Sequence, residues 1–183
     1  MSHTRDFIIE AIEQNTINST VLYLNGYLDA LSSFNSYSVI GMNYKLFAID
    51  LLAGDLITSI DHQAYKLFGR SQGEYQFELE SVLHWKSLIK EELRANLTRR
   101  IPGGNNEGLD YSVNDLVKDL HYHYINAFDI FLSLLEDNLL HKASEAYVVK
   151  ANGTRTFHSI VGVDLVFEIA PTQMIYLQLT GSD

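Results

Sequence analysis

Apolar positions recur every three or four residues over Ser112–Lys142, the longest stretch of the chain with one consistent period. This spacing predicts a single amphipathic helix whose apolar stripe faces the protein core. Ser112 is suited to cap the helix, and Asp115 adds a carboxylate near the positive end of the helix dipole. We therefore expect this long helix to be the element against which the rest of the chain packs.

Two shorter segments at the start of the chain also fit helices. Thr4–Gln14 predicts a short helix that ends at a polar break, Asn15–Asn18. Ser19–Ser33 has helical spacing, but the Asn-Gly dipeptide at 25–26 is also a hairpin signal. We favour a helix for this segment and keep the hairpin as the alternative.

The stretch that follows residue 43 also fits either a helix or a pair of strands. The spacing of Tyr44, Phe47 and Leu51 favours a helix. The alternative is a pair of strands, Lys45–Leu52 and Leu56–Ile60, joined by a turn that contains a glycine. We favour the helix here too.

Two more helical segments precede the central one. Asp61–Phe68 predicts one or two helical turns closed by Gly69. Glu78–Leu97 is a clear amphipathic pattern. Pro102–Gly108, rich in glycine and asparagine, predicts the loop that separates this helix from the central one.

After the central helix the pattern changes to that of strands. The Asn-Gly dipeptide at 152–153, between Tyr147–Lys150 and Thr154–Phe157, predicts a β-hairpin. Val161–Ile169 and Met174–Leu179 predict two further strands. Because the last of these is apolar almost throughout, we expect it inside a sheet rather than at an exposed edge.

These elements predict an α+β fold class in two consecutive parts. The N-terminal part, residues 1–142, is expected to be a helical layer of four to six helices with a long central helix. The C-terminal part, residues 146–180, is expected to be an antiparallel β-meander of three to four strands. The length of 183 residues suits a single domain that spans the whole chain, 1–183.

Composition narrows the class of protein. The content of 46% hydrophobic and 11% aromatic residues indicates a folded globular protein. No apolar run approaches the ~18 residues of a membrane span, and residues 1–13 lack the apolar core of a signal peptide. The sequence has no cysteine, which excludes disulfides and thiolate chemistry. We expect a cytoplasmic protein.

The net charge of the chain argues against nucleic-acid partners and favours a basic protein partner. The net charge of −10 would repel the phosphate backbone of a nucleic acid. Lys66–Arg100 holds 7 of the 13 basic residues, so the remainder of the chain is strongly acidic. An acidic surface of this kind suits a basic protein partner, since complementary potentials raise the rate of association.

Candidate chemistry is sparse. His62, His84, His121 and His123 show no metal-ligand spacing, and two histidines separated by one residue diverge on a helix. No nucleophile elbow, phosphate-binding glycine loop or dinucleotide-binding motif is present. We therefore expect no catalytic residues, metal or cofactor.

The combination of small size, acidity and absence of catalytic motifs resembles that of small immunity proteins, which bind a cognate toxin domain. This resemblance implies a non-enzymatic bacterial protein that binds and neutralises a basic toxin domain, such as a nuclease, without contacting nucleic acid or membrane. The oligomeric state is not implied. The expected contact residues lie on the polar side of the central helix: Asp115, Asp119, Tyr122, Glu136 and Asp137.

Two alternatives come from other functional classes. One is a helical-bundle, metal-dependent enzyme that uses His62, His84, His121 or His123, which would require these side chains to converge in the fold. The other is a small-molecule-sensing domain with an apolar pocket between the helical layer and the sheet.

Overall fold

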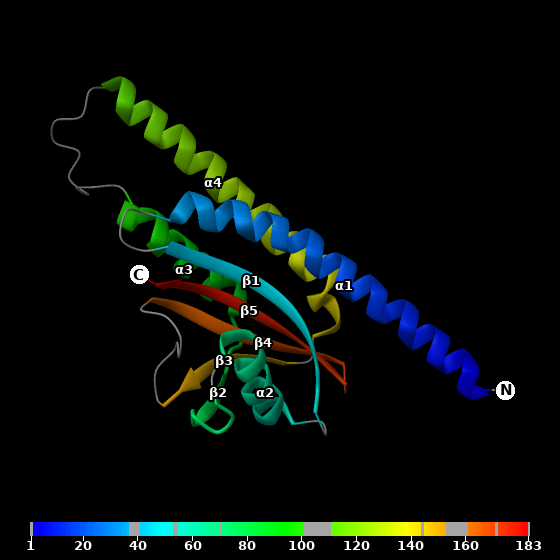
Figure 1. Ribbon diagram of the computed structural model, residues 1–183. Coiled ribbons are helices and arrows are strands. Elements are labelled where there is room, and N and C mark those ends of the chain that lie inside the picture. Colours follow the sequence, from blue (N-terminus) through cyan, green and yellow to red (C-terminus); the bar gives the residue numbers. More distant parts are fainter. Residues whose placement is uncertain are drawn as a thin grey trace.

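The computed structural model describes residues 2–36, 41–52, 55–69, 71–100, 111–143, 145–152, 161–170 and 172–182. These residues form four α-helices, one short 3₁₀ helix and one five-stranded antiparallel sheet (Figure 1). The helices are α1 (Ser2–Asn35), α2 (Leu56–Phe68), α3 (Trp85–Arg100), α4 (Tyr111–Asn138) and η1 (Leu140–Lys142). The strands are β1 (Gly41–Asp50), β2 (Phe77–Ser81), β3 (Glu145–Ala151), β4 (Val161–Ala170) and β5 (Gln173–Ser182).

The strand order is β1-β5-β4-β3-β2, so the last strand of the chain lies in the sheet interior. β5 pairs with β1 on one side, where Leu46 lies opposite Leu177, and with β4 on the other, where Leu177 lies opposite Leu165. The prediction that Met174–Leu179 forms an interior strand is confirmed.

Both faces of the sheet are covered by helices. Ile175, Leu177 and Leu179 of β5 belong to the larger core cluster, which also contains side chains of α1, α3 and α4. Met174 and Tyr176 belong to a second cluster on the opposite face, against α2. Figure 1 shows α2 on one side of the sheet and the three other α-helices on the other. Burial on both faces explains why the sequence of β5 is apolar without a clear alternation.

Local signals at the two ends set the limits of α2. The Asp55 carboxylate accepts a hydrogen bond from the Thr58 main-chain amide at 2.9 Å, and so caps the helix N-terminus. Gly69 ends the helix with a φ of 63°, where its amide donates to the Tyr65 carbonyl at 3.1 Å. Glycine adopts this left-handed conformation without steric cost. The predicted helical turns closed by Gly69 are confirmed.

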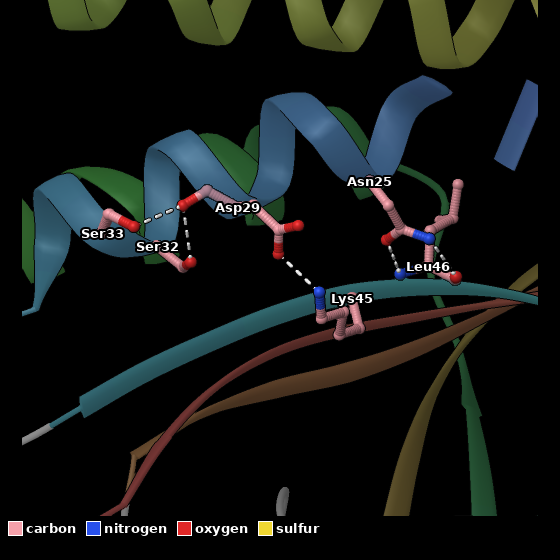
Figure 2. Close-up of polar contacts among 6 residues, drawn as sticks. All are labelled: Asn25, Asp29, Ser32, Ser33, Lys45 and Leu46. Carbon is pink, nitrogen blue, oxygen red and sulfur yellow. Dashed lines mark hydrogen bonds and ion pairs between the residues drawn. The ribbon is translucent and has the colours of Figure 1, made fainter. Parts of the chain in front are cut away.

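One edge of the sheet is covered by α1 rather than by another strand (Figure 2). The Asn25 side chain donates to the Leu46 carbonyl at 2.9 Å and accepts from the Leu46 amide at 2.8 Å. One turn along the helix, Asp29 forms an ion pair with Lys45 at 2.5 Å. The carboxamide of Asn25 thus takes the place of a neighbouring strand at the edge of β1.

The predicted central helix is largely confirmed. α4 covers Tyr111–Asn138, and η1 continues the coil to Lys142, so the single helix expected over Ser112–Lys142 is broken once near its end. Helical structure for Ser19–Ser33 is also confirmed, because α1 contains that segment. None of the described helices is long and apolar enough to cross a membrane.

The predicted fold class is wrong in its division into a helical layer and a later meander. Four helices and a five-stranded sheet are present among the described residues, and two of the strands, β1 and β2, come from the part expected to be helical. The predicted break at Asn15–Asn18 is wrong as well, because α1 runs through it without interruption. Asn18 lies on the exposed side of that helix, where a polar residue needs no turn.

The helix favoured after residue 43 is a strand. Tyr44 and Leu46 are buried in the larger core whereas Phe47 packs on the opposite face, which is the alternation of a strand covered on both sides. The alternative of two strands is correct for the first, because Lys45–Leu52 largely coincides with β1. It is wrong for the second, because Leu56–Ile60 belongs to α2. Glu78–Leu97 begins as strand β2 and becomes a helix at Trp85.

The first strand of the predicted hairpin, Tyr147–Lys150, lies in β3, but the strand that β3 pairs with is β4 (Val161–Ala170), which was predicted as a separate strand and not as the partner in the hairpin. β3 and β4 are antiparallel neighbours, and Asn152 at the end of β3 has a φ of 52°, as a turn residue of this kind can. Gly153 and Thr154–Phe157 lie outside the described residues, as does the Pro102–Gly108 loop.

We expect Asn25→Ala to lower the free energy of unfolding by about 1–2 kcal/mol relative to Asn18→Ala, because it leaves the Leu46 amide and carbonyl without their partner. Asn18 is exposed on the same helix, so its substitution carries the same gain in helix propensity. Urea denaturation followed by circular dichroism measures the difference. Equal stability of the two variants would contradict a structural role for the Asn25 contact.

Candidate functional site

The predicted contact residues all lie on α4, but the structure describes them unequally. Asp115, Asp119 and Tyr122 occupy the N-terminal half, where the helical backbone is described and the side chains are outside the described residues. Glu136 and Asp137 lie near the C-terminal end. Figure 1 shows the N-terminal half of α4 projecting beyond the sheet.

Glu136 does not present an uncompensated charge to solvent. Its carboxylate pairs with the Lys86 ammonium of α3, and Lys90, four residues later on α3, pairs at 2.6 Å with Asp129, seven residues earlier on α4. The two pairs line an open polar groove between α3 and α4, which Ser133 also borders. Each carboxylate here is matched by a lysine, so the groove is locally neutral. Such half-exposed pairs contribute little stability.

Asp137, next in sequence, points elsewhere. Its side chain is exposed and forms no ion pair within the part of the chain that the structure describes. Adjacent residues on a helix diverge by about 100°. For this reason Glu136 reaches α3 whereas Asp137 faces solvent.

Four of the exposed positions of α4 lie along one stripe. Asn126, Asp129, Ser133 and Asp137 are all exposed and follow one another at three- and four-residue spacing. The same spacing continued toward the N-terminus includes positions 115, 119 and 122. We call the seven positions the acidic stripe: Asp115, Asp119, Tyr122, Asn126, Asp129, Ser133 and Asp137. Glu136 lies beside it, facing α3.

The histidines do not converge among the described residues. His62 lies on α2, where its Nδ1 is 2.9 Å from the Gln72 amide nitrogen. His84 lies in the connection between β2 and α3, and His123 is exposed on α4. The side chain of His121 is outside the described residues. In the described ranges no three histidine, aspartate or glutamate side chains are placed to hold a metal ion.

The sequence prediction missed a buried polar cluster on the α2 side of the sheet. Asp164 of β4 lies opposite Gln178 of β5, with Tyr176 and Thr180 of β5 on the same face. Gln178 donates from its side-chain amide to the Thr180 hydroxyl at 2.9 Å. All four residues are at most 2% exposed. A charged residue within the apolar run Val163–Phe167 was the signal available in the sequence.

Burial sets the protonation state of this cluster. Removal from water raises the pKa of the Asp164 carboxyl to about 8, although the nearby Tyr176 hydroxyl acts to lower it. Burial, and then the neighbouring Asp164 charge, raise the pKa of Tyr176 well above 10. Asp164 is therefore mainly neutral at pH 7. Its complete burial identifies it as a polar part of the core and not as a site that a substrate reaches.

We expect Asp164→Asn to flatten the dependence of stability on pH. The folded-state pKa lies above that of an unfolded aspartate, so the folded chain holds a proton that the unfolded chain releases as pH rises. This contribution to stability is fully present below about pH 4 and is lost progressively toward pH 8, by at most about 1.4 kcal/mol per pH unit.

Urea denaturation of the wild type and of Asp164→Asn between pH 5 and pH 8 measures the effect. Asp137→Asn, which removes an exposed carboxyl, is the matched control and should retain the wild-type slope. The same slope in Asp164→Asn as in the wild type would contradict a protonated Asp164 in the folded protein.

Comparison of the chain with protein-family models, with curated proteins and with solved structures finds no match. What the protein does is therefore inferred from its own charges, burial and surface geometry.

Proposed function

We propose that the protein is a non-enzymatic, acidic binding protein of the bacterial cytoplasm that binds and neutralises a basic protein, in the manner of an immunity protein with its toxin domain. The net charge of −10 supports a basic partner. Such a partner could be a nuclease domain, whose basic nucleic-acid-binding surface an acidic protein complements.

The observation that carries the proposal is the acidic stripe of α4. Four of its seven positions are aspartates, and it contains no lysine or arginine. From Asp115 to Asp137 it spans about 33 Å at ~1.5 Å per residue, a length that suits a protein surface better than a small ligand. Asp129 is partly compensated by Lys90.

The place of the stripe in the fold supports the same function. The buried side of α4, with Phe131, Leu132 and Leu135, packs in the larger core. The part of the stripe from Asn126 to Asp137 is thus held on a helix whose opposite side is packed in the core, and a partner contacts it without displacing core residues. Rigid presentation of charge lowers the entropic cost of association.

The structure changes the emphasis among the expected contact residues. Asp137 remains a direct contact, whereas Glu136 acts mainly through its pairing with Lys86. Asp115, Asp119 and Tyr122 stay predictions that depend on the helical continuation of the stripe.

We expect the double substitution Asp119→Lys with Asp137→Lys to slow association with the basic partner about tenfold or more at low salt, because it reverses two charges of the stripe. The partner is first captured with the tagged full chain from the native host, and association is then measured by surface plasmon resonance at two salt concentrations. The free energy of unfolding should change little, since Asp137 is exposed.

Glu91→Lys together with Asp50→Lys gives the matched control, as both side chains are exposed and lie outside the stripe and outside β2. It carries the same change in net charge. If the control slows association as much as the stripe variant, the effect is one of total charge and the stripe is not the binding surface. Capture of no basic protein in a ratio near one to one would contradict the proposed function itself.

A further inference from the structure

β2 forms the second edge of the sheet, farthest from β1 in the strand order. The Val82 amide donates to the Ala146 carbonyl at 2.8 Å, and at the other end the Gln76 carbonyl accepts from the main chain that follows β3 at 2.9 Å. Main-chain groups in an antiparallel pair point toward the partner at alternate residues. Even-numbered positions therefore face β3, and Leu79 and Ser81 direct their amides and carbonyls away from it.

The two edge strands of the sheet differ in whether their outward main-chain groups are hydrogen-bonded. At β1, the Asn25 side chain binds the Leu46 amide and carbonyl. At β2, the outward main-chain groups of Leu79 and Ser81 have no hydrogen-bond partner within the described residues. Ser81 is exposed and Leu79 is half-buried. An edge with free donors and acceptors is a template for a further strand.

The side chains around this edge indicate what kind of strand it accepts. Glu78 and Glu80 are exposed and project from the same face of β2. Lys150 of β3 pairs with Glu80 at 2.5 Å, so that among the described residues of this edge the two carboxylates exceed the one lysine. Leu83, two residues beyond the end of β2, is 88% exposed. The edge therefore combines main-chain pairing groups, negative charge and one apolar contact.

The same charges argue against a second copy of this chain as the occupant. Pairing two β2 edges would place Glu78 and Glu80 of one copy against those of the other, and like charges across strands are destabilising. A strand with lysine or arginine at the facing positions forms favourable pairs instead. Charge complementarity thus selects a basic extended segment.

The β2 edge and the C-terminal end of the acidic stripe lie toward the same end of the α3–α4 pair. Lys86, at the start of α3, pairs with Glu136 near the end of α4. Leu83 precedes Lys86 by three residues, and Asp137 follows Glu136 directly. The helices run antiparallel, as the Lys90 pairing with an earlier α4 residue shows. One basic partner can therefore reach Asp137 and the β2 edge together.

We propose that β2 binds an extended segment of the basic partner, rich in lysine or arginine, as a sixth strand of the sheet. This inference rests on the proposed function, since the partner is the one inferred there. Main-chain pairing at Leu79 and Ser81 supplies affinity, and Glu78 and Glu80 select the sign of the charge.

The test uses Ser81→Pro in the full chain. Proline removes the outward amide of residue 81 and is tolerated at an edge where that amide does not take part in the ladder. Ser81→Ala keeps the amide and is the matched control. The probe is a ten-residue peptide of alternating lysine and threonine, with a glutamate–threonine peptide for comparison, in a nuclear magnetic resonance titration.

We expect the basic peptide to shift the amide signals of Leu79 and Ser81, with affinity about tenfold or more weaker for Ser81→Pro and unchanged within about twofold for Ser81→Ala. The acidic peptide should not bind. If Ser81→Pro does not fold, hydrogen exchange of the wild type is measured with and without the basic peptide. Protection of the Leu79 and Ser81 amides by the peptide would then support the inference, and unchanged exchange would overturn it. Binding elsewhere, no binding, or equal binding to the proline variant would overturn the inference.

Two further outcomes separate this inference from the proposed function. Capture of a basic partner that Ser81→Pro binds as tightly as the wild type does would overturn the β2 assignment and leave the proposed function standing. Self-association of the wild type that Ser81→Pro abolishes would make a second copy the occupant and would also overturn it. The absence of any basic partner would contradict the proposed function.

Discussion

Burial of β5 on both of its faces is the constraint on which the rest of the structure depends. The strand separates the larger core under α1, α3 and α4 from the smaller one under α2, and it contributes side chains to both. It also carries the hydrogen bonds that join β1 to the rest of the sheet. Each helix therefore has a face of the same sheet to cover, and the polar sides of the helices are left for solvent and partners.

The arrangement leaves the protein with two kinds of carboxyl group. Asp164 lies within the core, where burial keeps it mainly protonated at pH 7. Asp129 and Asp137 of the α4 stripe lie at the surface, where water supports their charge. Asp164 lies opposite Gln178 in the pairing of β4 with β5, whereas the exposed carboxylates set the potential that an approaching molecule meets. Asp164 is the one acidic residue in the buried set of the residues that the structure describes, so the interior described is otherwise free of carboxyl groups.

The parts of the fold that could be predicted are those with a strong local signal. In three places a short stretch of sequence is enough to predict the conformation: the periodic apolar positions of α4, the glycine that ends α2 and the apolar run of β5. β1 could not be assigned in this way, because the sheet is covered on both sides there. Tyr44 and Phe47 are both apolar although they face opposite cores, and their spacing imitates that of a helix.

The limits of prediction at the surface have a different cause. Glu136 and Asp137 are equivalent in sequence, and the difference between them arises from Lys86, which is brought beside Glu136 by the packing of α3 on α4. The outward amides of β2 could not be foreseen either, because the side on which a main-chain group is free depends on the register with β3. Tertiary pairing, and not residue type, decides both features.

The contact between Asn25 and Leu46 has a consequence for the order in which the chain folds. Asp50 and its partner Gln173 are separated by 123 positions, so a ribosome that adds about 5–20 residues per second makes β5 roughly 6–25 s after β1. During that interval β1 has no strand beside it, but α1 has already been synthesised. The Asn25 side chain can hold the new strand as it leaves the ribosome, and so shield an apolar segment from other nascent chains before its permanent neighbour is made.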